Sequence, residues 1–211
     1  MTWSIDEIAR RIAQDLPTGA VVNLGVGLPL AVGNHITDPS LVLHSENGLF
    51  GMGGAAAPGH EDPDVVNAGK QSVTLVRGAA ITDQADSFGA VRSGVLDLAI
   101  LGAYQVAVNG DLANWRRPDE KIAGIGGALD IAMGAKSVWA MMKARTDDGS
   151  SKLLTECTFP LTASGVVRRV YCELGILEPR PDQGVFVLLE LAPEVTEDDI
   201  RAQIAGEVMI P

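Results

Sequence analysis

Apolar residues along this chain follow two spacings, one typical of helices and one typical of buried strands. Near the start, four apolar residues recur every three to four positions: Ile5, Ile8, Ile12 and Leu16. This spacing predicts an amphipathic helix. Ser4 and Glu7 stand at the separation of a capping box at its start, and Pro17-Thr18-Gly19 ends it.

Short continuous apolar runs predict the strands. They lie at residues 20–24, 41–43, 72–76, 96–101, 138–142, 166–171 and 185–191. Helices are predicted between these runs and after the last one, over residues 32–36, 87–93 and 126–133 and from Thr196 to near Gly206.

The order of these elements predicts the fold class. Strands that alternate with short helices are typical of one α/β domain, here residues 1–211, built on an open, largely parallel sheet with helices on both faces. Residues 54–70 are rich in glycine, proline and polar side chains, which predicts a long surface loop. Residues 145–152 are predicted as a solvated turn.

Composition agrees with this fold and narrows the function. Hydrophobic residues make up 46% of the 211 residues but aromatic residues only 4%, so an aliphatic core is expected, as in parallel sheets covered on both faces. The net charge of −11 argues against nucleic acid as a partner. The first residues lack a basic and then apolar leader, and no apolar run approaches the ~20 residues of a membrane span. We therefore expect a soluble, cytoplasmic protein without membrane contact.

No metal site is expected from the cysteines and histidines. Cys157 and Cys172 are too few and too widely spaced for a metal or disulfide framework. The histidines do not approach them, or one another, at ligand spacing. His44 precedes Ser45, but neighbouring side chains on a strand point to opposite faces, so a catalytic histidine is not expected there.

The strongest candidate for chemistry is Glu46. It follows the predicted strand 41–43 and precedes a run that contains Gly48, Gly51 and Gly53. Glycines let the backbone turn sharply and approach a ligand, and open α/β sheets bind their ligands at such strand ends. A carboxylate with a reference pKa of about 4.3 is ionised at neutral pH and can attack an activated acyl group directly. The alternative is a carboxylate that only holds the turn.

Several motifs, in this order, resemble one enzyme family. They are G-V-G-L-P at 25–29, S-E-N-G-L-F-G-M-G at 45–53, G-D-L-A-N-W at 110–115, G-I-G-G-A-L-D at 124–130 and P-L-T at 160–162. The set resembles the B (beta) subunit of the two-subunit 3-oxoacid CoA-transferases, which include the succinyl-CoA:3-oxoacid and 3-oxoadipate enzymes. The resemblance spans residues 4–211 and implies the CoA-transferase (NagB/RpiA-like) fold.

The resemblance implies a role for Glu46 and for five small residues. Glu46 would attack an acyl-CoA, form an acyl-glutamyl anhydride and then carry CoA as a glutamyl thioester, so CoA is a substrate and no cofactor is held permanently. Contacts to CoA or to the reacting thioester are expected from Gly25, Gly27, Gly126, Gly127 and Ala128. For the first two, close backbone packing is an equal alternative.

The resemblance also implies partners and leaves alternatives open. The reaction would move CoA from succinyl-CoA to a 3-oxo acid such as 3-oxoadipate or acetoacetate, in an α2β2 assembly with a separate A subunit. An acyl-CoA hydrolase or ring-opening enzyme on the same scaffold, or a sugar-phosphate isomerase-like domain, are the alternatives. Residues 91–95, V-R-S-G-V, depart from the I-R-G-G-H of relatives, so the acceptor acid is not identified.

A few polar residues stay without an assigned role. Gln105 and Asn114 could orient substrate or satisfy loop backbone, and Trp115-Arg116-Arg117 could contact a CoA phosphate or form a solvated loop. The remaining cations of this kind are Lys70, Lys121 and Lys136.

Overall fold

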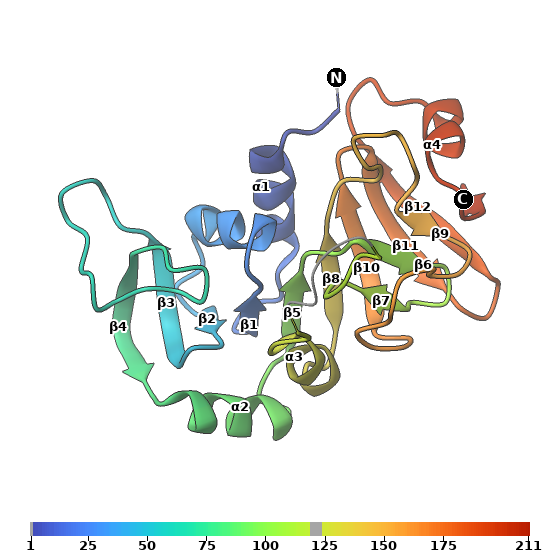
Figure 1. Cartoon of the computed structure of the whole chain (residues 1–211). Helices are drawn as coiled ribbons and strands as arrows, with labels where there is room; N and C mark the ends of the chain where they lie inside the picture. The colour runs from blue at the N-terminus through green and yellow to red at the C-terminus, as the bar shows by residue number, and fades with distance from the viewer. Residues whose placement is uncertain (1, 119–123) are drawn as a thin grey trace.

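The computed structural model describes residues 2–118 and 124–211 (Figure 1). Within them a ten-stranded sheet runs across the molecule in the order β13-β12-β11-β10-β8-β5-β1-β2-β3-β4. Its strands are β1 (Val21–Leu24), β2 (Val42–Ser45), β3 (Leu49–Ala55), β4 (Val73–Ile81), β5 (Leu98–Leu101), β8 (Val138–Met141), β10 (Val167–Cys172), β11 (Gly175–Arg180), β12 (Val185–Leu191) and β13 (Val208–Met209).

The centre of the sheet is parallel and its flanks are antiparallel. Strands β2, β1, β5, β8 and β10 pair in parallel, whereas β3 and β4 on one side and β11 and β12 on the other pair antiparallel. From β1 the chain moves outward to β2, β3 and β4 and then returns to β5 on the other side of β1. The strand order therefore reverses at the centre, and the predicted open, largely parallel sheet is confirmed.

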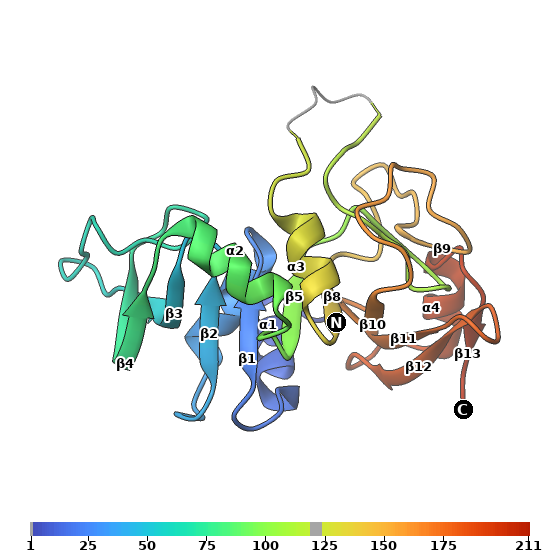
Figure 2. The same cartoon turned by 90° about the horizontal axis from the view of Figure 1, so that it is seen from below.

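Helices cover both faces of the sheet, as predicted. On one face, α1 (Ile5–Asp15) and the 3₁₀ helix η1 (Leu28–His35) pack with Val22 and Leu24 of β1. On the other, α2 (Gln84–Arg92) and α3 (Ala128–Gly134) pack with Ala99 and Leu101 of β5 (Figure 2). Alternate side chains of a strand point to opposite faces, so each central strand contributes to both cores.

Two predicted helix starts are confirmed and one helix type is wrong. The Ser4 hydroxyl accepts a hydrogen bond from the Glu7 N–H (3.2 Å), and the Glu7 carboxylate accepts one from the Ser4 N–H (2.7 Å). The last helix, α4 (Glu197–Gln203), begins with the same type of capping box at Thr196. The α-helix predicted over 32–36 is the 3₁₀ helix η1 instead, because Pro29 lacks an N–H and Gly33 disfavours a continuing α-helix.

Strand β3 was not predicted, because its sequence contains three glycines. It forms a hairpin with β2 through Glu46-Asn47-Gly48, and Gly48 has φ +118°. A Cβ at Gly48 would lie 2.1 Å from the Thr82 carbonyl oxygen, and one at Gly53 would lie 2.2 Å from Thr74 Oγ1. These glycines admit the neighbouring backbone closely while the chain stays extended, rather than forming an irregular loop.

Further short strands also escaped prediction. A second sheet, of β6 (Gln105–Ala107), β7 (Leu112–Ala113) and β9 (Leu153–Leu154), lies beside the main one. Strand β11 has the sequence G-I-L-E-P-R, which lacks a regular alternation, and β13 has only two residues. The long loop predicted over 54–70 is present as residues 56–72, between β3 and β4.

Candidate active site

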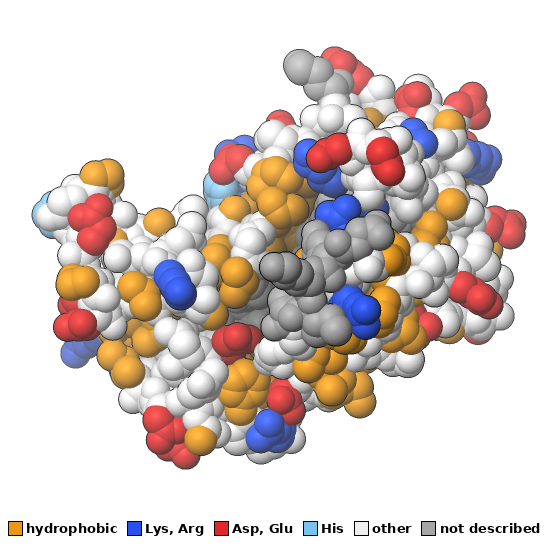
Figure 3. Space-filling view, in the orientation of Figure 1, with side chains coloured by type: hydrophobic (Ala, Val, Ile, Leu, Met, Phe, Trp, Pro, Cys, Tyr) orange, Lys and Arg blue, Asp and Glu red, His pale blue; other side chains and the backbone are white. Residues whose placement is uncertain are grey.

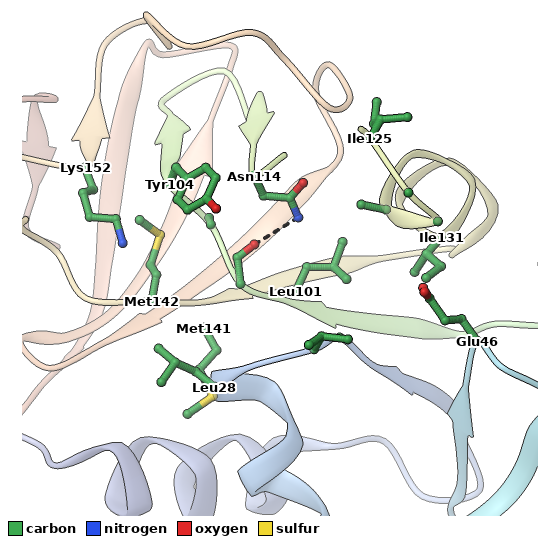
Figure 4. A pocket seen from close by; sticks show the side chains of 17 residues that line it. Leu28, Glu46, Leu101, Tyr104, Asn114, Ile125, Ile131, Met141, Met142 and Lys152 are labelled. Carbon is green, nitrogen blue, oxygen red and sulfur yellow. Dashed lines mark hydrogen bonds between the residues drawn. The ribbon is translucent and has the colours of Figure 1, made fainter. Parts of the chain in front are cut away.

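A cavity of about 430 Å³ lies at the carboxyl ends of four neighbouring parallel strands (Figure 4). The residue that follows each strand lines it: Gly25 after β1, Glu46 after β2, Gly102 after β5 and Met142 after β8. This is the sheet edge, beside the reversal of strand order, where open α/β sheets bind ligands. The predicted position of Glu46 at a strand end is therefore also a position in a cavity.

The neighbours of Glu46 fasten its loop and leave its carboxylate to the cavity. The Ser45 hydroxyl accepts a hydrogen bond from the Ala68 N–H (2.9 Å), and the Asn47 amide donates one to the Val66 carbonyl (2.8 Å). Glu46 itself forms no hydrogen bond or ion pair with the residues that the structure describes. Its side chain is half-buried, and this burial raises the pKa of the carboxyl above its ordinary value.

The turn before α3 lies directly against this carboxylate. A Cβ at Gly127 would lie 2.7 Å from Glu46 Oε2 and 2.5 Å from Cζ of Phe88, so only glycine allows the approach. Gly126 has φ +57°, in the left-handed region that favours glycine. Gly126, Gly127 and Ala128 all line the cavity together with Glu46. The structure thus brings together residues that lie far apart in the sequence.

The two glycines of the first predicted loop separate in space. Gly25 lines the cavity, and its N–H donates to the Ile100 carbonyl (2.9 Å). A Cβ there would lie 3.0 Å from that oxygen, so close packing against β5 also requires a small residue. Gly27, with φ +94°, lines a different cavity of about 350 Å³ between η1 and β3. The expected pairing of the two around one ligand is not seen.

Gln105 and Asn114 hold loops. The Gln105 carbonyl oxygen accepts hydrogen bonds from the N–H groups of Thr158 (2.8 Å) and Phe159 (3.0 Å). The Asn114 amide donates to the Gly102 carbonyl (3.1 Å) and accepts from the Thr162 hydroxyl (2.6 Å). Asn114 also lines the cavity, so its structural role does not preclude contact with a ligand.

Lys152 is a cavity residue that sequence reasoning missed. It was predicted at the end of a solvated turn, but its side chain is half-buried and extends into the cavity from the side opposite Glu46 (Figure 4). Burial lowers the pKa of its ammonium group. The Lys152 N–H donates to the Ala144 carbonyl (2.8 Å), and this bond brings the end of the turn back onto the sheet. The following apolar pair, Leu153-Leu154, was the signal that the turn ends in a buried strand.

His44 is structural, as expected. Its ring is fully buried, with Nδ1 3.0 Å from the Asn23 amide nitrogen and Nε2 2.9 Å from the Ser87 hydroxyl. The assigned tautomer therefore carries its proton on Nε2 and accepts at Nδ1. Burial lowers the pKa of His44 to about 4, so the ring is neutral at pH 7. It joins β1, β2 and α2 beneath the cavity.

The other cations and the cysteines lie away from Glu46. Lys136 forms an ion pair with Asp97 (2.7 Å), and the Arg117 guanidinium lies 6.0 Å from the centre of the Tyr104 ring. Lys121 lies outside the described residues. Both cysteines are free, and burial raises the pKa of each thiol to about 12.

Neither a metal cluster nor a membrane span is found in the part of the chain that the structure describes. No group of three His, Cys, Asp or Glu residues there is placed to hold a metal ion. No helix within the same residues combines the length and apolarity needed to cross a bilayer.

Comparison with known proteins places this site in a family. The coenzyme A transferase family model matches residues 5–203. The chain is 50% identical over 205 residues to the B subunit of the 3-oxoadipate CoA-transferase of Pseudomonas putida, covering 97% of this chain and 95% of that one. It is 42% identical over 202 residues to the B subunit of the succinyl-CoA:3-ketoacid coenzyme A transferase of Helicobacter pylori, covering 96% and 97%.

A solved structure has the same fold. The acyl-CoA transferase YdiF of Escherichia coli O157:H7, in a thioester complex with CoA, aligns with a TM-score of 0.77 and 22% identity. The alignment covers all of this chain and 42% of that longer chain. By the match to the family model and the identity to two curated relatives over nearly their whole lengths, this chain belongs to the coenzyme A transferase family.

Proposed function

We propose that this chain is the B subunit of a 3-oxoacid CoA-transferase and that Glu46 is its covalent nucleophile. The observation that carries the proposal is the unpaired Glu46 carboxylate, held in a strand-end cavity against the glycine turn at residues 126–128 of the described chain. A carboxylate needs no general base to act as a nucleophile, so a site without a base beside it is consistent with this chemistry.

The proposed reaction proceeds by two half-reactions. The Glu46 carboxylate attacks the thioester carbonyl of the acyl-CoA, which releases CoA thiolate and leaves an acyl-glutamyl anhydride. The thiolate attacks the glutamyl carbonyl, which releases the first acid and leaves a glutamyl-CoA thioester. An acceptor acid then reverses these steps, so the thioester bond is retained and ping-pong kinetics are expected.

The glycine turn would stabilise the charge that develops in each transfer. Both attacks pass through tetrahedral oxyanions, which are stabilised by fixed backbone N–H donors. The N–H groups at the start of a helix have no partner within the helix, and Gly127 and Ala128, at the start of α3, line the cavity with Glu46. We assign the oxyanion and thioester contacts to Gly126, Gly127 and Ala128, and a backbone contact with CoA to Gly25.

The proposed substrates and partner follow from the relatives. Relatives that match nearly the full chain are named as B subunits of 3-oxoadipate and succinyl-CoA:3-ketoacid transferases. We propose succinyl-CoA as donor, a 3-oxo acid as acceptor, and an A subunit in an α2β2 assembly. An acyl-CoA hydrolase on the same scaffold would instead consume acyl-CoA with water alone, which an assay without acceptor detects.

The first prediction concerns the glutamyl-CoA adduct. The complex incubated with succinyl-CoA alone should gain the mass of CoA on Glu46, because the first half-reaction needs no acceptor. Borohydride reduces a thioester but not a free carboxylate, so it should inactivate only the acyl-CoA-treated enzyme. Glu46→Gln should abolish transfer and the adduct while the complex still assembles.

Glu156→Gln is the matched control, because Glu156 is exposed and outside the cavity. It should keep both the adduct and the activity. An adduct on another residue, or transferase activity above roughly a hundredth of wild type in Glu46→Gln, would exclude Glu46 as the nucleophile, since loss of a covalent nucleophile removes the whole catalysed route.

A further inference from the structure

The cavity contains a second charged side chain, Lys152, for which the proposed chemistry at Glu46 provides no role. Lys152 lies just before β9, and Figure 4 shows its side chain reaching into the cavity across from Glu46. Its ammonium forms no hydrogen bond or ion pair within residues 2–118 and 124–211. A half-buried cation without a counterion is costly, and buried charges in proteins are normally paired.

The surroundings of Lys152 favour an anion at this end of the cavity. Burial is the main cause that lowers the pKa of its ammonium group, and the positive charges of Arg117 and Lys143 lower that pKa further, whereas Glu173 opposes them. The Glu173 carboxylate, however, accepts the Ala144 N–H (2.9 Å) and is not ion-paired with Lys152. In a chain of net charge −11, this local excess of cations is a distinct feature of the cavity.

The two charged ends of the cavity suit a substrate with two acyl ends. Glu46 marks the end where the thioester reacts, and Lys152 marks the other (Figure 4). Leu101, Ala103 and Met142 line the space with them, which suits a short aliphatic chain. Succinyl and 3-oxoadipyl groups have this form: an acyl carbon, a short chain and a distal carboxylate.

We propose that Lys152 binds the distal carboxylate of a dicarboxylic acyl group while its reacting carbonyl lies on Glu46. Lys152 then selects dicarboxylic over monocarboxylic acids. The inference rests on the proposed function for the position of the acyl group, but carboxylate binding by Lys152 can be measured without turnover.

The kinetic test compares two acceptors that differ only at the distal end, 3-oxoadipate and 3-oxohexanoate. The enzyme is the complex of this chain with its co-expressed A subunit. A charge-assisted hydrogen bond contributes enough that Lys152→Met should lower kcat/KM for 3-oxoadipate about 10- to 100-fold. The value for 3-oxohexanoate should stay within about twofold, and Lys152→Arg should restore part of the preference.

A binding test separates this inference from the proposed function. Adipate, but not hexanoate, should raise the melting temperature of the wild-type complex, and Lys152→Met should remove that difference. This readout holds even if the complex transfers no CoA. Lys136→Met is the control, because Lys136 is exposed, paired with Asp97 and outside the cavity.

Three results would overturn the inference. Equal losses for both acids would show that Lys152 has no selectivity for a distal carboxylate. A raised KM for succinyl-CoA and butyryl-CoA alike would assign Lys152 to a CoA phosphate. Loss of the A subunit from Lys152→Met on size-exclusion chromatography would assign it to a contact between subunits.

Discussion

The position of a single carboxylate depends on a missing methyl group. Gly127 has φ −79°, which any residue adopts, so its backbone conformation does not require glycine. The space does, because a Cβ would lie 2.7 Å from Glu46 Oε2 and 2.5 Å from the Phe88 ring. The glycine therefore holds the carboxylate and the turn in contact, and this contact is specific to the site rather than to the fold.

Gly127→Ala should therefore damage activity more than stability. The added methyl displaces the Glu46 carboxylate from the turn, and a misplacement of about 1 Å can cost about 100-fold in rate. We expect kcat to fall about 10- to 100-fold, with a melting temperature within a few degrees of wild type.

Gly89→Ala is the matched control, because Gly89 is an exposed position of α2 with nothing within 4 Å of an added Cβ. It should keep full activity and stabilise the helix by about 0.5–1 kcal/mol. A Gly127→Ala enzyme with normal kcat would show that the contact is not catalytic.

At the scale of elements, buried polar contacts under the cavity were not predictable. Periodicity and capping residues predicted α1, the central parallel strands and the strand end at Glu46, because these signals are local. Strand β3 was missed because its glycines meet β4, and Lys152 was missed because the turn folds back onto β6. Both depend on partners distant in the sequence.

The His44 network joins three elements and predicts an acid-labile fold. Its pKa is about 4 when folded against 6.5 as the ordinary value, so between these values the unfolded chain binds more protons than the folded one. Stability must then fall as pH falls through this range. Between pH 7 and pH 5 the loss from this one group should be about 2 kcal/mol.

Urea unfolding of the wild type and His44→Gln at pH 7 and pH 5 tests this. The variant lacks the titrating ring, so its free energy of unfolding should decrease by about 2 kcal/mol less than that of the wild type. The other carboxylates titrate in both proteins and cancel in the comparison. An equal decrease in both would show that His44 does not contribute to the pH dependence.

At the scale of the whole molecule, the surface carries apolar side chains that a partner would cover. Val26 (56% exposed) lies at the cavity, and Met133 (64%) lies on α3 beside it. Ile81 (65%) lies on β4, the exposed edge of the sheet. Figure 3 shows hydrophobic side chains at the surface over these regions of the molecule. Groups of exposed apolar side chains mark interaction sites, and relatives are named as one of two subunits.

We therefore expect transfer activity to require the A subunit. Purified alone, this chain should show no turnover, because it would supply the nucleophile but covers only 42% of the longer acyl-CoA transferase chain that shares its fold. Titration with purified A subunit should restore activity and saturate at equal amounts of the two chains. Met133→Glu should weaken this restoration, because a charge at an apolar interface is costly to desolvate, whereas Glu156→Gln should not. Full turnover by the isolated chain would contradict the two-subunit assignment, and it would place the complete CoA and acid site within these 211 residues.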